Sequence, residues 1–236
     1  MTISDRFDKI GHMGRPPRIT TGGLVYHVLN RANARIRIFG KPGDYNAFER
    51  ILVEAVQRTE MRLLSYCVMP NHWHLVVWPR HDGDLSTMVG WLTLTHTQRW
   101  HAHQDSVGTG HVYQGRYKSF LVESDEHLWA VCRYVERNAL RAGLCERAEQ
   151  WRWSSLWRRT FGDEECREVL SKWPTDVPKN WLTRVNQAES QHELEALRRC
   201  ISRAQPFGDD NWTEQMTKRF SLDTTFRPRG RPKKTP

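Results

Sequence analysis

The sequence of 236 residues contains no CxxC pair and no apolar run that approaches membrane-spanning length. Its five cysteines are odd in number and scattered, so we expect neither a disulfide framework nor a cysteine zinc site. The opening MTISDRFDKI is too charged for a signal peptide, and no segment predicts a transmembrane helix. We therefore expect a cytoplasmic protein without a membrane partner.

Acidic side chains are fewer than basic ones: 27 Asp and Glu stand against 36 Lys and Arg, which gives a formal net charge of +9. This excess favours a polyanionic partner, and nucleic acid is the first candidate. Eleven tryptophans are a high number, and although many will be core, aromatic rings among basic residues also suit the stacking of unpaired bases. The alternative is a basic protein with no such partner.

The hydrophobic patterns predict an α+β fold. Strands are expected at 24–30, 63–69, 72–78 and 117–123, and helices at 44–59, 85–103 and 125–141. This order predicts an antiparallel-rich sheet with helices on one face. After Trp151 the pattern becomes mainly helical up to about Arg203, and from Asn211 on the chain is polar and basic.

These shifts divide the chain into four expected parts: a basic lead-in (1–20), an α+β domain (21–160), a helical extension (161–210) and a basic tail (211–236). The extension could be a DNA-binding element or an autoinhibitory cap. In the tail, Arg229-Gly230-Arg231-Pro232 is typical of an AT-hook, which lies extended in a narrow minor groove. The alternative is a basic tail that adds only non-specific attraction to DNA.

A His-x-His pair, His72 and His74, flanks Trp73 on a predicted strand. Alternate residues of a strand share a face, so both imidazoles point the same way and Trp73 points into the core. Two imidazoles on one rigid face can hold a divalent cation. The alternative is two surface histidines on an edge strand. His101 and His103 have the same spacing on a predicted helix, where a step of two residues turns them about 200° apart, so they are expected at the surface.

The predicted helix 125–141 carries a tyrosine beside its apolar stripe. Tyr134 and Asn138 lie one turn apart on the flank of that stripe, which consists of Leu128, Cys132, Val135 and Ala139. A tyrosine held there can present its hydroxyl outward, and the amide of Asn138 can offer an oxygen to the same metal. The alternative is that Tyr134 only edges the core.

Five segments match one family in the same order: LVYHVLNRANAR (24–35), MPNHWHLVV (69–77), YQGRYKSFLVES (113–124), RYVERNALRAGL (133–144) and TTFRPRGRPKK (224–234). Together they resemble the REP-associated tyrosine transposases, which act at repeated extragenic palindromes. These transposases belong to the HUH superfamily of single-strand DNA nucleases and transposases. The match covers residues 15–160 and the tail, and several motifs in order are far more specific than any one alone.

The resemblance implies a ferredoxin-like HUH fold and a role for each matching residue. His72 and His74 correspond to the two metal-binding histidines, Tyr134 to the nucleophile and Asn138 to the third ligand. The implied cofactor is Mg²⁺ or Mn²⁺, and the implied chemistry is strand cleavage and rejoining through a 5′-phosphotyrosine. The family motif continues asparagine-proline-valine, whereas this sequence has Asn138-Ala139-Leu140. Because alanine favours a helix, we expect the loss of proline to be harmless.

The implied partner is single-stranded or hairpin DNA, folded from a repeated extragenic palindrome. Arg116 and Lys118, next to a predicted strand, and Arg133 and Arg137, on the tyrosine helix, are candidates for phosphate contacts, with a solvated basic face as the alternative. Arg229 and Arg231 would serve the AT-hook. The superfamily includes both monomers and homodimers, so the oligomeric state stays open.

Three other functions are considered. The first is a former transposase that binds hairpins or A·T-rich DNA without cutting, against which the retained His-Trp-His and Tyr134–Asn138 set argues. The second is a conventional insertion-sequence transposase or a plasmid-nicking relative, and the helical extension and basic tail favour the REP-associated branch instead. A metal-dependent hydrolase of small molecules is disfavoured by the charge.

Overall fold

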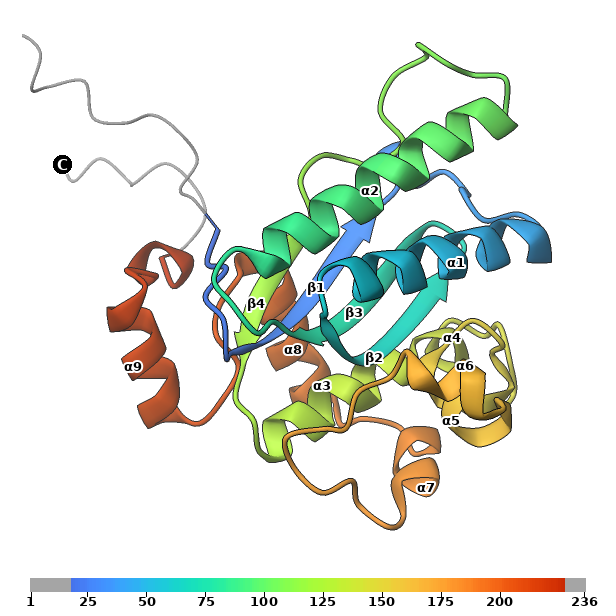
Figure 1. The fold of residues 1–236 in the computed structure, drawn as a ribbon. Helices are drawn as coiled ribbons and strands as arrows, with labels where there is room; N and C mark the ends of the chain where they lie inside the picture. Colours follow the sequence, from blue (N-terminus) through green and yellow to red (C-terminus); the bar gives the residue numbers. More distant parts are fainter. Residues whose placement is uncertain (1–17, 228–236) are drawn as a thin grey trace, which may run out of the picture.

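A four-stranded antiparallel sheet forms the centre of the computed structural model, which describes residues 18–227 (Figure 1). The strand order across the sheet is β2-β3-β1-β4. The strands are β1 (Val25–Arg31), β2 (Arg62–Met69), β3 (His72–Trp78) and β4 (Lys118–Val122). Pro70 and Asn71 form the turn between β2 and β3. β1 and β3 are therefore the two central strands, and β2 and β4 are the edges.

Two long helices, α1 (Pro42–Arg58) and α2 (Asp84–His103), pack side by side on one face of the sheet (Figure 1). Pro42 begins α1, and the Asp44 carboxylate accepts hydrogen bonds from the backbone N–H groups of Gly40 and Lys41. The buried stripe of α1 meets Trp73 and the other side chains that this face of the sheet presents. This packing forms the larger of two hydrophobic clusters.

The second cluster lies on the opposite face, where short helices cover the sheet. They are α3 (Glu126–Glu136), α4 (Asn138–Arg141), α5 (Ser155–Phe161), α7 (Trp181–Asn186) and α8 (Gln191–Arg203), and α6 (Glu164–Glu168) packs against α5. α3 packs against β2 and β3, and α8 packs against β4. Short 3-10 helices occur at Asn33–Arg35, Ala148–Gln150 and Asp223–Thr225.

The expected α+β fold with an antiparallel sheet is confirmed, and the structure adds a second helical layer. We expected helices on one face, whereas they cover both. The physical reason lies in the strands themselves, because seven consecutive residues of the edge strand β2 and five of the central strand β3 are buried. A strand that is buried on both faces needs a covering layer on each side.

The segment 211–236, which we expected to be a basic tail, begins with a helix, α9 (Asp210–Arg219). The Asp209 side chain caps it by accepting from the Trp212 backbone N–H. Trp212, Met216 and Phe220 recur every four residues and pack against the larger cluster. This apolar stripe explains the helix. The final residues of the tail lie outside the described part of the chain.

A buried carboxylate joins the helices of the second face. Glu136, at the end of α3, has no exposed surface. It accepts hydrogen bonds from Ser155 at 2.6 Å, from Arg159 at 2.6 Å and from the Trp181 indole at 2.8 Å. Because a buried charge is costly unless it is paired, this network fixes α3 relative to α5 and α7.

Within residues 18–227, no helix combines the length and the apolar character that crossing a membrane requires.

Candidate active site

The two histidines of β3 lie on the same face of the sheet, as their spacing predicts. The ring centroids of His72 and His74 are 5.0 Å apart. Trp73 points to the other face, where it is fully buried and its indole donates to the Tyr113 hydroxyl at 2.9 Å. β3 is a central strand, not an edge, so the alternative of two surface histidines on an edge strand is wrong.

Each imidazole has a hydrogen-bond partner on its Nδ1 atom. His72 Nδ1 lies 2.7 Å from Asn71 Oδ1, and His74 Nδ1 lies 2.8 Å from Nε2 of His27 on β1. Burial, together with the nearby charges of Arg31 and Arg141, lowers the pKa of His72 to about 3. Burial also lowers the pKa of His74 well below its usual value. Both rings are therefore neutral near pH 7, which is the form that binds a metal.

Tyr134 on α3 faces this pair across the second cluster. Its ring centroid lies 5.9 Å from that of His74 in an edge-to-face arrangement, and the residue is 8 % exposed. The sequence has six tyrosines, all within the described residues, and the other five (Tyr26, Tyr45, Tyr66, Tyr113 and Tyr117) belong to the cluster on the opposite face. Tyr134 is therefore the tyrosine that shares a face with the histidine pair.

Asn138 begins α4, one turn after Tyr134, and is buried. The expected continuous helix 125–141 is interrupted at Arg137, where ψ is −4° instead of the helical value near −42°. The backbone N–H of Arg137 still bonds to the Arg133 carbonyl, so the chain keeps its direction through the break. The role of Asn138 as a third ligand stays a prediction.

Two arginines of the tyrosine helix contact the extension. Arg133 donates to the carbonyls of Gln187 and Ala188, and Arg137 donates to those of Val185 and Asn186. Glu189, between α7 and α8, pairs with Arg137 at 3.0 Å and with Arg141 at 2.7 Å. Their shared role is to hold the α7–α8 segment against α3. Contact of Arg133 and Arg137 with DNA stays a prediction.

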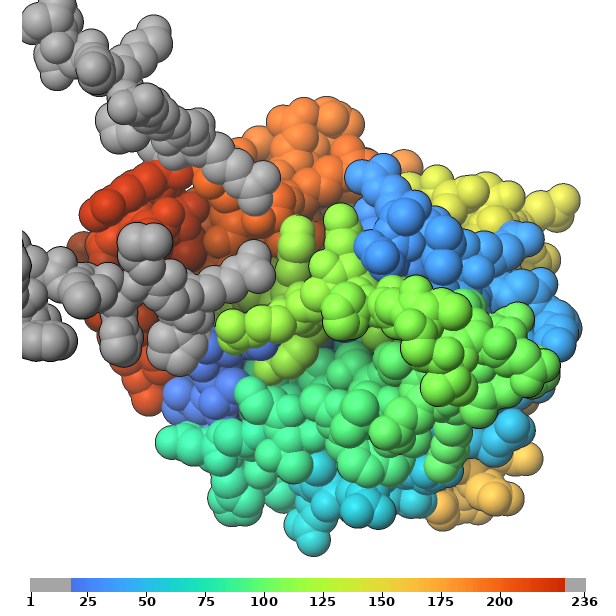
Figure 2. Space-filling view, turned by 90° about the horizontal axis from the view of Figure 1, so that it is seen from above, coloured from blue at the N-terminus to red at the C-terminus, as the bar shows by residue number. Residues whose placement is uncertain are grey.

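Arg116 and Lys118 line a groove of about 920 Å³ along the edge strand β4. Figure 2 shows the residues that precede β4, in light green, next to the orange surface of α8. None of the described residues that line the groove is acidic, and its cations are Arg18, Arg31, Arg35, Arg116, Lys118 and Arg203. Tyr117, Phe120 and Phe220 add aromatic surface. Arg229 and Arg231 lie outside the described residues.

The pairing of the strands shows how close the groove lies to the histidine pair. Lys118 is paired with Leu29, and Leu29 is paired with His74, so all three stand in one row on one face. Neighbouring strands are about 4.8 Å apart, which puts the backbones of Lys118 and His74 about 10 Å from each other. In the next row Arg31 is paired with His72.

Four residues that the sequence did not single out complete the site. His27 and Asn71 bond to the histidine pair, and Arg31 stands opposite His72. The guanidinium of Arg141 lies 4.1 Å from the centroid of the Tyr134 ring. Asn71 precedes His72 in the chain and could have been found from that adjacency. His27 is 47 residues from its partner, so only the strand pairing identifies it.

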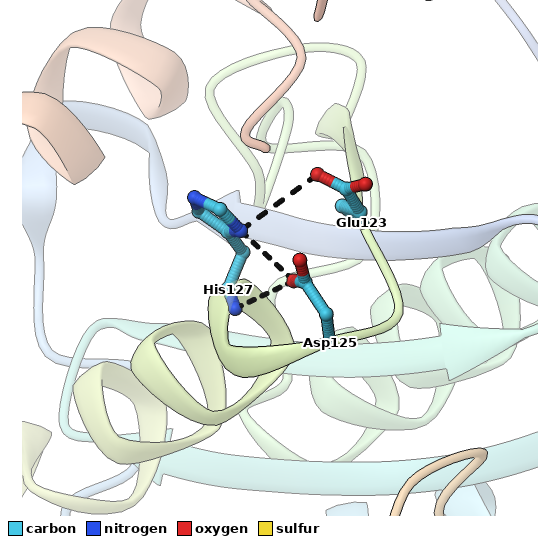
Figure 3. A group of neighbouring side chains, drawn as sticks. All are labelled: Glu123, Asp125 and His127. Carbon is cyan, nitrogen blue, oxygen red and sulfur yellow. Dashed lines mark hydrogen bonds and ion pairs between the residues drawn. The ribbon is translucent and has the colours of Figure 1, made fainter. Parts of the chain in front are cut away.

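A second group with metal-compatible spacing, Glu123, Asp125 and His127, lies at the start of α3 (Figure 3). Its polar atoms bond within the protein. Asp125 caps α3 by accepting from the His127 backbone N–H, and its carboxylate also lies 2.8 Å from His127 Nδ1. Glu123 accepts from the Asp209 backbone N–H at 2.8 Å. These contacts explain the group as a helix cap and an anchor for the chain that leads to α9.

The site thus consists of a His-x-His pair on a central strand and a tyrosine on a covering helix that faces it. The family described as "Transposase IS200 like" matches residues 20–138, which is half of the chain and includes every residue of the predicted catalytic set. The chain therefore belongs to the IS200-like transposases, and the resemblance found in the motifs is confirmed at this level.

Two relatives extend the comparison. The chain is 20 % identical, over 151 residues, to a Haemophilus influenzae protein named "Putative REP-associated tyrosine transposase"; the match covers 59 % of this chain and 82 % of the relative. The fold is similar to a solved REP-associated tyrosine transposase bound to a REP hairpin, with a TM-score of 0.52 and 15 % identity. That match covers 75 % of this chain and 93 % of the other.

Proposed function

We propose that this protein is a metal-dependent single-strand DNA endonuclease and strand transferase that acts through a 5′-phosphotyrosine on Tyr134. One observation carries the proposal. All six tyrosines lie within the described residues, and Tyr134 alone shares a face with His72 and His74. Membership of a transposase family supports DNA strand exchange as the reaction class.

The residues fit a divalent metal ion. His72 and His74 are neutral at pH 7, lie on one face and have their Nδ1 atoms occupied, which leaves Nε2 of each ring as the ligand atom. Asn138 would supply an amide oxygen as the third ligand. Nitrogen and oxygen donors of this kind suit Mg²⁺ or Mn²⁺. When bound, the ion would withdraw charge from the scissile phosphate.

The chain's own residues then account for the transfer. The Tyr134 oxygen attacks the phosphorus, a tyrosine–phosphate bond forms, and the bond from phosphorus to the 3′ oxygen breaks. The Tyr134 proton is released and the departing 3′ oxygen takes one up, so a 3′-hydroxyl leaves. Attack by another 3′-hydroxyl reverses the step and rejoins strands without ATP. Arg141, whose guanidinium lies over the Tyr134 ring, and Arg31, which stands opposite His72, can balance the charge that develops.

The β4 groove supports single-stranded or hairpin DNA as the substrate. Six cations without an acidic neighbour in the described lining attract phosphates, and aromatic side chains can stack unpaired bases. The similar solved transposase holds a REP hairpin, so we propose a hairpin from a repeated extragenic palindrome for this chain as well. Arg229 and Arg231 would add minor-groove contacts. Such a substrate would place the protein at the nucleoid in the cytoplasm.

The test is cleavage of labelled single-stranded hairpins, taken from short repeats of the source genome, in Mn²⁺ or in EDTA. Replacing both His72 and His74 by Ala should abolish cleavage in Mn²⁺ and leave hairpin binding largely intact. The matched control replaces His101 and His103, which have the same spacing on α2, by Ala and should cut like wild type. Tight binding with no cleavage by wild type in any metal would instead favour a DNA-binding protein that has lost catalysis.

A further inference from the structure

The hydrogen bonds to the Nδ1 atoms of His72 and His74 bear on which ring nitrogen carries the proton. We propose that Asn71 and His27 are positioning residues that hold His72 and His74 in the tautomer with the proton on Nδ1. Each ring then presents an Nε2 lone pair to a divalent cation. This inference rests on the proposed function, because it assigns these bonds a role in metal binding.

For His72 the protonation follows from the neighbouring amide. The Asn71 amide nitrogen donates to the Arg35 carbonyl at 3.0 Å, which fixes the nitrogen on that side. The amide oxygen must then be the atom that lies 2.7 Å from His72 Nδ1. An amide oxygen can only accept, so Nδ1 of His72 carries the proton. A neutral ring has one such proton, and Nε2 is therefore left with its lone pair.

For His74 the partner is a second neutral imidazole. His27 Nε2 and His74 Nδ1 are 2.8 Å apart, so one of the two atoms carries the shared proton. If His27 donated, His74 would carry its own proton on Nε2 and could not bind a metal through that atom. A metal on His74 therefore requires His27 to accept. His27 is 1 % exposed and its ring also packs against Phe120, which fixes its orientation.

The two bonds together would prepare the pair before the metal arrives. Metal-bound histidines commonly donate their second ring N–H to a partner, and loss of that partner costs roughly 10- to 100-fold in metal affinity. Here the partner of His72 lies in the tight β2–β3 turn, and the partner of His74 lies on the neighbouring strand β1. Each ring is therefore held by a residue on rigid backbone.

The protonation can be read directly, without DNA. Nitrogen NMR of protein labelled with ¹⁵N in its histidines distinguishes the two neutral tautomers, and His72→Gln, His74→Gln and His27→Gln variants assign the signals. We expect the proton on Nδ1 in all three rings, at pH 7.5, before and after Mg²⁺ is added. A proton on Nε2 of His72 or His74 would overturn the inference, whether or not the protein cuts DNA.

The role in metal binding is tested with matched pairs of variants. Asn71→Asp keeps an acceptor but loses the donor to Arg35, whereas Asn71→Leu loses both. His27→Gln keeps an acceptor, whereas His27→Leu is apolar and lacks one. Mn²⁺ affinity is measured by electron paramagnetic resonance, and circular dichroism confirms that each variant is folded.

Because affinity is the readout, the variants need to be folded but not active. Asn71→Leu and His27→Leu should bind Mn²⁺ roughly 10- to 100-fold more weakly than wild type. Asn71→Asp and His27→Gln should stay close to wild type. Equal loss in both members of a pair would show a structural role only and would overturn the inference. If wild type fails to bind Mn²⁺ while the tautomers are as expected, the proposed function fails and the positioning geometry stands.

Discussion

Three neutral histidines stand close together in a part of the protein with little access to water. His27 contacts His74, which contacts His72, and the positive charges of Arg31 and Arg141 lie nearby. Such a cluster keeps its imidazoles unprotonated and ready for a metal at neutral pH. The folded state loses stability in acid, because these histidines stay neutral in the folded protein but can become protonated in the unfolded chain.

We therefore predict that stability falls on acidification. Burial lowers the pKa of His27 to about 3 and, on the other face, that of His96 to about 4. Between pH 7.5 and 5.5 the unfolded chain takes up protons at these positions and the folded chain does not. The free energy of unfolding should then drop by roughly 1 kcal/mol for each histidine.

Urea titrations at the two pH values measure this effect. His96→Gln should show a smaller pH dependence than wild type, because it removes one of the contributing groups. A free energy of unfolding that stays constant from pH 7.5 to 5.5 would contradict the account of neutral buried histidines.

At the scale of elements, the Glu136 network sets the position of α3 and so of Tyr134. Removal of this carboxylate leaves Arg159 without its ion pair and the Trp181 indole without its acceptor, and it takes one acceptor from the Ser65 and Ser155 hydroxyls. We predict that Glu136→Ala lowers the free energy of unfolding by about 3–5 kcal/mol, the usual cost of breaking a buried ion pair. Glu195→Ala, on the exposed side of α8, should change it by less than about 0.5 kcal/mol. Equal effects in urea titrations would refute a special role for Glu136.

The elements that the sequence predicted well are those with local signals. Apolar runs and turn residues place β2 and β3 almost to the residue, and the alternation of side chains along a strand puts His72 and His74 on one face. Two features depended on distant parts of the chain. The continuous apolar run of β2 indicates burial but does not name the layers that cover it, and α9 has a stripe that the charged residues around it conceal.

The candidate site was predictable in part for the same reason. Tyr134 and Asn138 follow from helical spacing, and the resemblance supplied their roles. His27 was missed because alternation gives the face of a strand and not the neighbour across it. The partners of Arg133 and Arg137 were missed as well, since the α7–α8 segment is about 50 residues further along the chain.

At the scale of the whole molecule, part of the excess of basic residues is concentrated in the β4 groove. We predict that Arg116→Ala and Lys118→Ala each reduce the slope of log binding constant against log salt concentration by about 1. Binding should weaken to a similar extent for hairpins of any DNA sequence. Lys172→Ala, which is exposed and does not line the groove, is the control. Fluorescence anisotropy across a salt series provides the measurement. Unchanged slopes for both groove variants would place the DNA elsewhere.

The central claim is that Tyr134 becomes covalently attached to DNA. The most direct measurement incubates the protein with a labelled hairpin substrate in Mn²⁺, isolates any protein–DNA adduct on a denaturing gel and maps the modified peptide by mass spectrometry. The account predicts a phosphotyrosine at Tyr134, absent in EDTA and absent in Tyr134→Phe. An adduct that persists in Tyr134→Phe, or one that maps to Tyr113 or Tyr117 on the opposite face, would contradict it.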